Sequence, residues 1–462
     1  MQKKWIYKSP QTDVVNDIAE KMDVSRAFAA VLVNRGVTSA VDAKAFFECD
    51  VKNLISPYLL PDIEKTVSRI REAVDKKEKI LIYGDRDVDG VTSVCIIYKT
   101  LKSLGAEIVW YVPLDEGYGM HKEVIERYHK EGVSLIITVD CGITAVNEAQ
   151  YIKSLGIDLI ITDHHEPSPD GLPEAVAVVD PKRFDSKYPF SELAGCAVSF
   201  KVSEAVMMSF GKYFNKEIAA LGIMETEDGI EASITVSKND LIINSFSRTI
   251  RGDGDQKKLL GFIGDRCLVV SNREAIETLF KKHFNFELKN KIIEIFHAGA
   301  YIQADEVLKA FYNKEYADDI RMRFFMEDNL DLAALGTIAD IMPLINENRI
   351  IVKEGLRLLG NSSKPGVQAI IERCSRTNNG NTLSAKNISW NVTPVLNAAG
   401  RRGKAGLAVE LILAKKPYRA NELLDQIIEL NDQRRDLQSE NLEKFMVLVE
   451  EQCDIVNDKL LM

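Results

Sequence analysis

Four short motifs contain the residue types that bind divalent metal ions in proteins. They are Asp85-Arg86-Asp87-Val88-Asp89-Gly90, Asp140-Cys141-Gly142, Asp163-His164-His165-Glu166 and Thr337-Ile338-Ala339-Asp340. The first three each follow a short apolar run that predicts a buried strand, over residues 80–83, 135–139 and 159–162. Open α/β sheets build their sites beyond the carboxyl ends of their strands. We therefore expect these side chains to meet at one edge of a sheet.

The chemistry of these side chains favours a particular kind of site. Carboxylates and imidazoles together suit Mg²⁺ or Mn²⁺. Two such ions a few Å apart are the usual means by which enzymes cut phosphodiester bonds. The motifs therefore predict a metal-dependent phosphoesterase.

The first motif places three carboxylates at alternate positions. If they lie on a strand end, Asp85, Asp87 and Asp89 project to one side and repel one another unless a cation is present. Gly90 lets the backbone turn tightly into a helix that we expect to start near Thr92. A calcium-binding EF-hand loop also starts Asp-x-Asp-x-Asp-Gly, but it needs a Glu at its twelfth position, where this chain has Ile96. Solvated turn carboxylates remain a further alternative.

The other three motifs differ in how specific they are. Asp140 and Asp340 could each simply cap a helix, and only the neighbouring motifs make Asp140 a ligand candidate. Asp340 ends an apolar run, where a carboxylate is costly to bury without a partner. The adjacent pair His164-His165 at a strand end is the most specific signal, because imidazole binds borderline metals and needs an orienting acceptor on its second nitrogen.

The bulk composition describes an ordinary globular protein. The chain has 462 residues, of which 46% are hydrophobic and 28% charged, and the net charge is −10. No apolar run approaches a membrane span, and residues 1–7 lack the apolar core of a signal peptide. Seven cysteines without a Cys-x-x-Cys pair are typical of a reducing compartment, so we expect a cytoplasmic protein. The acidic balance means that any nucleic-acid groove must be a confined basic patch.

The periodicity of apolar residues divides the chain into five segments. Residues 1–78 predict a helical lead-in packed on the core. Over 79–205, short apolar runs alternate with helices, which predicts an α/β fold with a doubly wound, mostly parallel sheet. Residues 206–328 break this rhythm and predict an inserted α+β subdomain, and 329–415 return to the core. Residues 416–462 predict a long, highly charged connector helix.

These motifs together resemble the DHH phosphoesterase family, and in particular the RecJ single-stranded-DNA exonucleases. The supporting stretches, besides the four motifs, are Pro394-Val-Leu-Asn-Ala-Ala-Gly-Arg, Asn34-Arg-Gly-Val and Leu59-Leu-Pro-Asp. The resemblance covers about 1–205 and 330–450. It implies that a DHH core is formed by 79–205 and 329–415.

The resemblance also implies roles for individual residues. Five would hold two Mn²⁺ or Mg²⁺ ions: Asp87, Asp89, Asp140, His164 and Asp340. Among them Asp140 would bridge the two ions, while Asp85 and His165 would complete or support the site. Arg401 would face the scissile phosphate, with Asn397 nearby, and an always-charged planar guanidinium suits that task.

The implied activity is 5′-to-3′ exonuclease hydrolysis of single-stranded DNA in DNA repair and recombination. Single-stranded DNA is the expected partner, and a single-strand-binding protein is a further candidate. Two alternatives remain: a DHH phosphodiesterase of short oligonucleotides or cyclic dinucleotides, and a nucleic-acid-binding module with little activity. The second would resemble the DHH-derived subunit of the eukaryotic replicative helicase, but such relatives lose ligands that this chain keeps.

The chain departs from the RecJ pattern in three places. Arg86 stands where many RecJ proteins have Tyr or Phe, and the insertion at 206–328 has no assigned role. No Gly-Gly-His-x-x-Ala-Ala-Gly-type motif follows the core, so the C-terminal DHH-associated domain is expected to be absent from this chain. We therefore expect the helix from about 420 to 456 to expose apolar side chains such as Leu437, Phe445 and Leu448.

Overall fold

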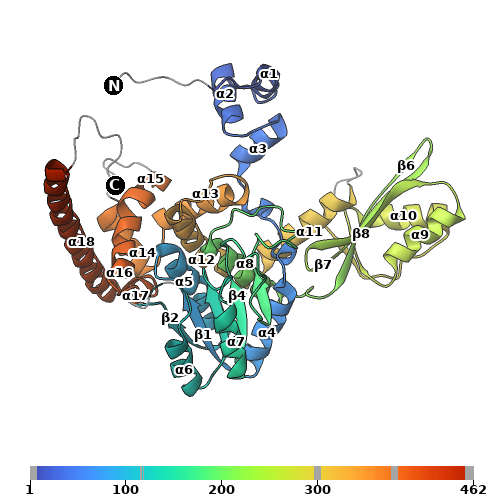
Figure 1. Cartoon of the computed structure of the whole chain (residues 1–462). Coiled ribbons are helices and arrows are strands. Elements are labelled where there is room, and N and C mark those ends of the chain that lie inside the picture. The colour runs from blue at the N-terminus through green and yellow to red at the C-terminus, as the bar shows by residue number, and fades with distance from the viewer. Residues whose placement is uncertain (1–7, 115–116, 118, 296–302, 376–382, 453–462) are drawn as a thin grey trace.

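The computed structural model describes residues 8–114, 117, 119–295, 303–375 and 383–452. Its central layer is a five-stranded parallel sheet in the order β2-β1-β3-β4-β5 (Figure 1). The strands are β1 (Lys79–Gly84), β2 (Glu107–Tyr111), β3 (Val133–Val139), β4 (Asp158–Thr162) and β5 (Ala177–Val179). β2 lies on one side of β1 and the later strands on the other, so the strand order reverses between β1 and β3. This confirms the predicted doubly wound, parallel sheet.

Alternating side chains along each strand bury both faces of this sheet. Ile80 and Ile82 pack in the core that contains α4 (Ile63–Asp75), α5 (Val88–Ser103) and α8 (Gly195–Met208). Leu81 and Tyr83 point to the opposite face, against α6 (Lys122–Lys130) and α7 (Val146–Ser154). Because both faces are covered, the strands are apolar at nearly every position, as in other parallel sheets.

The start of α5 differs from the prediction. The helix begins at Val88 and not near Thr92, so Asp89 and Gly90 lie in its first turn. Asp87 is the N-cap residue, and its Oδ1 accepts a hydrogen bond from the Gly90 backbone N–H at 3.0 Å. The expectation that three carboxylates alternate along a strand end was therefore wrong. An Asp at the N-cap accepts a hydrogen bond from a free amide of the first turn, so the helix can start four residues earlier than expected.

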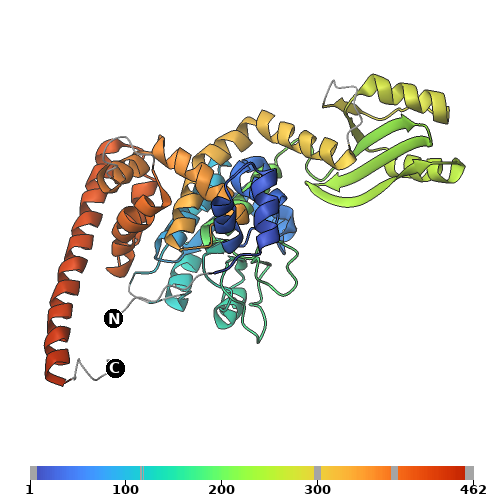
Figure 2. The ribbon, with the colours of Figure 1, turned by 90° about the horizontal axis from the view of Figure 1, so that it is seen from above.

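A second, separate sheet lies to one side of the first (Figures 1 and 2). Its order is β10-β9-β6-β7-β8, with β6, β7 and β8 antiparallel and β9 and β10 parallel to β6. The strands are β6 (Glu217–Thr226), β7 (Gly229–Lys238), β8 (Leu241–Ile250), β9 (Cys267–Val270) and β10 (Ile292–Glu294). Helices α9 (Asp253–Ile263) and α10 (Arg273–Phe284) cover one face, and α11 (Ala304–Asp318) covers the other. β7 and β8 form a hairpin in which Lys238 pairs with Leu241.

Continuous helices connect the two sheets. The predicted boundary at residue 205 falls inside α8, and that at 328 falls inside α12 (Ile320–Ala339). α12 packs on α5 and α8 of the core, and its N-terminus adjoins α11 of the second sheet (Figure 2). α12 therefore leads directly from the second sheet to Asp340. Residues 296–302 of the predicted insertion lie outside the described residues.

The N-terminal helices have a small core of their own. Residues such as Ile18, Ala29 and Leu32 pack together from α1 (Thr12–Lys21), α2 (Arg26–Asn34) and α3 (Ala40–Glu48). Two short 3-10 turns, Val51–Asn53 and Pro57–Leu59, lead from there to α4. Side chains of α13 (Asn346–Gly360) hold this segment, because Arg349 and Lys353 donate hydrogen bonds to backbone carbonyls near the end of α3.

The C-terminal part is helical. It contains α14 (Pro365–Cys374), α15 (Ala385–Asn387), a π-helical turn (Ile388–Val392), α16 (Thr393–Arg401), α17 (Gly406–Ile412) and α18 (Pro417–Gln452). The second half of α18 exposes Leu437, Phe445 and Leu448, as predicted, with 46%, 51% and 49% of each residue accessible. Residues 453–456 of the predicted helix lie outside the described residues. Among the described helices, none is long and apolar enough to cross a membrane.

Candidate metal centre

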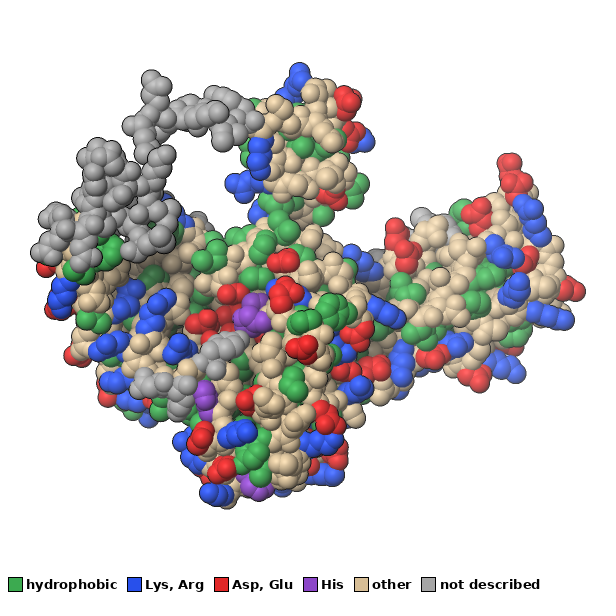
Figure 3. Space-filling model, in the orientation of Figure 1, with side chains coloured by type: hydrophobic (Ala, Val, Ile, Leu, Met, Phe, Trp, Pro, Cys, Tyr) green, Lys and Arg blue, Asp and Glu red, His purple; other side chains and the backbone are tan. Residues whose placement is uncertain are grey.

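The ends of three neighbouring strands position most of the predicted ligands. Asp85 directly follows β1 and Asp140 directly follows β3, while His164 and His165 lie two and three residues beyond the end of β4. β1 and β3 are the strands between which the strand order reverses. A crevice forms at such a point in open α/β sheets because the helices on either side diverge. Figure 3 shows carboxylate and histidine side chains gathered near the middle of this face, with Lys and Arg on the neighbouring surface toward the C-terminal helices.

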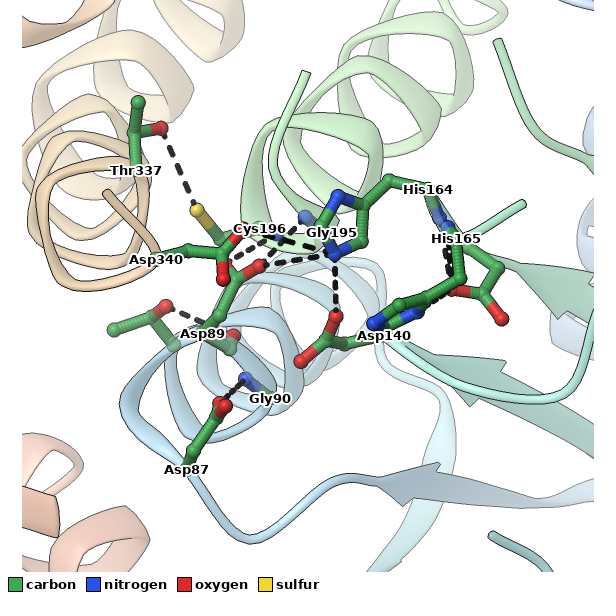
Figure 4. A network of polar contacts seen from close by, with 12 residues as sticks. Asp87, Asp89, Gly90, Asp140, His164, His165, Gly195, Cys196, Thr337 and Asp340 are labelled. Carbon is green, nitrogen blue, oxygen red and sulfur yellow. Dashed lines mark hydrogen bonds and ion pairs between the residues drawn. The ribbon is translucent and has the colours of Figure 1, made fainter. Parts of the chain in front are cut away.

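Helix α5 and helix α12 bring the remaining carboxylates to the same place (Figure 4). Asp87 caps α5 and Asp89 lies buried in its first turn. Gly90 permits this arrangement, since a Cβ there would lie 2.4 Å from the Asp85 carbonyl oxygen. Asp340 is the C-cap residue of α12, 175 residues beyond His165 in the sequence. The close approach of backbone, and not a positive φ angle, is what requires glycine at position 90.

The side-chain atoms lie within metal-binding range of one another. His164 Nε2 is 3.2 Å from Asp140 Oδ1, 3.7 Å from Asp89 Oδ2 and 3.8 Å from Asp340 Oδ2. Three sets of residues each have ligand atoms within 4.8 Å: Asp89, His164 and Asp340; Asp85, Asp87 and Asp140; Asp140, His164 and His165. All seven predicted residues thus come together, and Asp140 and His164 each belong to two of the sets.

Asp140 has an unusual backbone conformation. Its φ angle is +59°, in the left-handed region that costs a non-glycine residue on the order of 1 kcal/mol. Its backbone N–H donates to the Thr162 carbonyl at 3.0 Å, which joins the ends of β3 and β4. A Cβ on Gly195 would lie 2.4 Å from Asp140 Oδ1. Strand pairing and the N-terminus of α8 therefore hold this carboxylate in one position.

Several buried polar atoms of the cluster have no hydrogen-bond partner among the described residues. They are Asp85 Oδ1, Asp140 Oδ1 and His164 Nδ1, and the contact from His164 Nε2 to Asp140 Oδ1 lacks hydrogen-bond geometry. Leaving such atoms unpaired costs folding free energy, on the order of 1–3 kcal/mol each. A divalent cation would bind carboxylate oxygens here and offset their mutual repulsion. The donor set therefore fits one or two hard or borderline divalent metal ions.

The protonation equilibria in the metal-free protein point the same way. Burial, together with the negative charges of Asp89 and Asp87, raises the pKa of Asp340 to about 7. Burial and the same two carboxylates also raise the pKa of Asp140 well above its ordinary value. Burial lowers the pKa of His164, which favours the neutral imidazole that binds metals. Without a cation, the cluster thus holds protons that a metal ion would displace.

Two backbone amides in the site were not predicted from the sequence. The N–H groups of Gly195 and Cys196, at the start of α8, donate to Asp89 Oδ2 at 2.7 Å and to Oδ1 at 2.9 Å. A helix N-terminus stabilises a negative charge, so α8 fixes Asp89 through both of its oxygens. Backbone donors leave no side-chain signal in a sequence.

Asp163 and Asp180 are two further acidic residues at the same edge. Asp163 Oδ1 lies 2.7 Å from His165 Nδ1, and its Oδ2 accepts from the Ile143 backbone at 2.9 Å. The hydrogen bond to Asp163 is the main reason that the pKa of His165 is raised. A carboxylate next to a candidate ligand histidine is the signal that could have identified this orienting role. Asp180 follows β5, and burial raises its pKa to about 7.

The predicted substrate residues lie on α16. Asn397 Oδ1 accepts a hydrogen bond from the Val88 backbone N–H at 3.0 Å, so this side chain holds the first turn of α5. Gly400 approaches the loop of the first motif so closely that a Cβ would lie 2.2 Å from the Arg86 carbonyl oxygen. Arg401, the next residue, is exposed at the end of α16. The helix that carries Arg401 is thus in direct contact with the loop that carries Asp85 and Asp87.

Comparison with known proteins supports this description. Residues 79–224 match the model of the DHH family, N-terminal domain. The single-stranded-DNA-specific exonuclease RecJ of Bacillus subtilis is 29% identical over 454 residues, covering 97% of this chain and 42% of that protein. RecJ of Escherichia coli is 27% identical over 409 residues, covering 88% of this chain and 52% of that protein. The chain thus spans about half the length of the curated relatives that it matches.

A solved structure shows the same fold. The crystal structure of RecJ from Thermus thermophilus in complex with Mn²⁺ superposes with a TM-score of 0.59 at 22% identity, over 94% of this chain and 46% of that one. The fold, the matched domain and the extent of the sequence similarity agree. The chain is therefore similar to RecJ proteins over most of its length, and its residues 79–224 are similar to the N-terminal domain of the DHH family.

Proposed function

We propose that this chain is a metal-dependent exonuclease that hydrolyses single-stranded DNA in the 5′-to-3′ direction. The observation that carries the proposal is the meeting of seven side chains of metal-binding types, from four distant segments, at the switch point of the sheet. The relatives named as single-stranded-DNA-specific exonucleases give the substrate class.

The geometry supports a division of labour among the residues of the cluster. Asp89, His164 and Asp340 would hold one Mn²⁺ or Mg²⁺ ion, and Asp85 and Asp87 would hold the second. Asp140 belongs to the second set and also lies beside His164, which suits it to bridge the two ions. When bound, two such ions lower the pKa of water and neutralise charge on a phosphodiester.

Other residues of the chain would position these ligands and the substrate. Asp163 orients the His165 ring, and the amides of Gly195 and Cys196 fix Asp89. Arg401, on the surface beside the first motif, would bind the scissile phosphate through its guanidinium. Asn397 supports this arrangement by holding the first turn of α5 and would contribute to substrate binding through its remaining N–H groups.

A single-strand-binding protein as partner, a cytoplasmic location and a role in DNA repair and recombination rest on the resemblance to RecJ. In agreement with a reducing compartment, the six described cysteines are all free thiols.

The proposal can be tested with end-labelled single strands. Purified protein should release mononucleotides from the 5′ end of single-stranded DNA with Mn²⁺ and should be inactive with EDTA. Asp140→Ala should lower the rate by at least about 100-fold, as losing a central charged group in a catalytic site does. Asp170→Ala, an exposed loop carboxylate, is the matched control.

Two results would count against the proposal. Undiminished hydrolysis by Asp140→Ala at saturating Mn²⁺ would exclude the bridging role. Hydrolysis of a dinucleotide, with none of longer single strands, would indicate a phosphodiesterase of short oligonucleotides instead.

A further inference from the structure

Three lysines surround one tyrosine at the junction of the core and the second sheet. The Nζ atoms of Lys212, Lys216 and Lys291 lie 5.1, 5.9 and 5.7 Å from the centre of the Tyr213 ring. Lys212 and Lys216 belong to the segment between α8 and β6, and Lys291 directly precedes β10. We call these four residues the Tyr213 patch.

The tyrosine is a fixed platform. Its ring packs edge-on against Phe311 of α11, with the ring centres 5.1 Å apart, and it joins the apolar cluster under the second sheet. The ring remains partly accessible, and all three lysines are exposed. An aromatic ring held in this way keeps its geometry when a ligand binds, so it adds affinity without the cost of ordering a loose side chain.

The lysines have no acidic partner to explain their grouping. Within the part of the chain that the structure describes, none of the three ammonium groups has a carboxylate within 4.0 Å. The acidic residue whose charge acts on Lys212 and Lys291 is Glu315. It is half-buried, and burial raises the pKa of its carboxyl group. Like charges that gather without counter-charges repel one another, and a polyanion relieves that repulsion. Such a local basic group stands out on a chain with a net charge of −10.

Charge and aromatic surface together favour a particular polyanion. Proteins that bind single strands without sequence preference combine lysines or arginines along the backbone with rings on which bases stack. An acidic polypeptide would satisfy the charge but has no bases to stack on the ring. The observations therefore favour a single-stranded nucleic acid.

We propose that the Tyr213 patch binds the backbone of a single strand whose end occupies the metal centre. This inference rests on the proposed function and extends it to a distal anchor. Helix α8 separates the two places: its first residues bind Asp89, and Lys212 lies four residues beyond its end. A helix of 14 residues spans about 20 Å. Only strands long enough to cover that distance can reach both.

The length dependence of binding tests the proposal. A labelled deoxythymidine dinucleotide is too short to cover this distance even when extended, whereas a strand of about twenty nucleotides covers it even at the stacked spacing of about 3.4 Å per nucleotide. We would measure their affinity by fluorescence anisotropy with Mn²⁺ present, so that the metal centre can bind the strand end, and with phosphorothioate linkages that resist cleavage. For K212Q/K216Q/K291Q we expect about 10- to 100-fold weaker binding of the long strand and unchanged binding of the short one. The salt dependence should also weaken, by about 0.7 in slope for each phosphate that the variant no longer neutralises.

A matched variant controls for net charge. K257Q/K258Q/K281Q removes three exposed lysines from α9 and α10, which cover the opposite face of the same sheet, and should bind long strands like the parent. Y213F should keep the affinity and Y213L should lose about 10-fold, because a leucine side chain offers no ring on which a base can stack.

The outcomes separate this inference from the proposed function. If both lysine variants bound the long strand equally weakly, or both bound it like the parent, the Tyr213 patch would not be a specific anchor. Neither result would count against the proposed nuclease activity. Loss of polyglutamate binding with DNA binding intact would also overturn the anchor and would make the patch a site for acidic polypeptides. A parent protein that degrades no single strand with Mn²⁺ would instead overturn the proposed function itself.

Discussion

Asp163 shows how a residue beside the ligands can control one of them. Its carboxylate is fully buried. It is hydrogen-bonded to the His165 ring and accepts hydrogen bonds from the backbone amides of Ile143, after β3, and His164, after β4. Asp163→Asn should reduce kcat/KM by about 10- to 100-fold, the usual effect of losing a group that orients a metal-binding histidine. Circular dichroism should show an intact fold, and Glu166→Gln, an exposed neighbour, should retain full activity. Equal activity of the two variants would contradict the orienting role.

Asp240 allows a pH-dependent prediction away from the metal centre. It lines a cavity of about 660 Å³ between the two sheets, and burial, with the charge of Glu204, raises its pKa to about 7. The ionised form therefore destabilises the fold. This cost is absent below about pH 4, grows as the pH rises toward 7, and is constant above it. Asp240→Asn should raise the free energy of unfolding at pH 8, on the order of 2 kcal/mol.

Urea unfolding at pH 8 and near pH 4.5 measures this difference. The gain from Asp240→Asn should shrink at the lower pH, whereas Asp228→Asn, in the exposed turn before β7, should give no gain at either. A gain that is the same at both pH values would show that the ionisation of Asp240 is not its cause.

At the residue scale, the sequence was informative where the ligands are side chains at strand ends. The carboxyl ends of β1, β3 and β4 lie side by side in any parallel sheet with this order, so Asp85, Asp140 and His164 were predictable. The place of Asp340 came only from the family resemblance, because no local pattern relates α12 to the sheet. The amides of Gly195 and Cys196 could not be predicted, since every residue has such a group.

At the scale of elements, the contact of α16 with the first motif connects Arg401 to the metal centre. Gly400→Ala would place a methyl group against the Arg86 carbonyl, which cannot move without displacing Asp85 and Asp87. We expect a loss of about 1–3 kcal/mol in unfolding free energy, as for other overpacked contacts, together with reduced nuclease activity. Gly360→Ala, at the end of α13 where a Cβ meets nothing within 4 Å, should be neutral or slightly stabilising. Equal stability of the two variants would contradict this.

The elements also show why helix starts are hard to read from sequence. The apolar periodicity of α5 becomes clear only after Thr92, but the helix begins earlier because Asp87 caps it and Asn397, about 300 residues away, holds the Val88 amide. The cap was visible in the sequence as an Asp three residues before Gly90. The support from α16 was not, because it depends on the tertiary fold.

At the scale of the whole molecule, the parallel core was predictable, whereas of the second sheet only its α+β character was predictable and its strand order was not. In the core, successive strands alternate with helices, so the right-handed crossover rule limits the possible orders. In the second sheet, β6 pairs with β7 but also with β9, which follows some 40 residues later. Neither the hairpin nor the helices around it specify that pairing. The placement of the Tyr213 patch depends on it, because Lys291 comes beside Lys212 only through β9 and β10.

Anomalous scattering from crystals soaked in Mn²⁺ would show whether the seven side chains form a two-metal centre. We expect two peaks about 3.5–4 Å apart, with Asp140 between them. One should lie beside Asp89, His164 and Asp340 and the other beside Asp85 and Asp87. Asp140→Ala crystals soaked in the same way should lose at least one peak. The absence of manganese from this cluster in the parent protein, with peaks only elsewhere, would contradict the account.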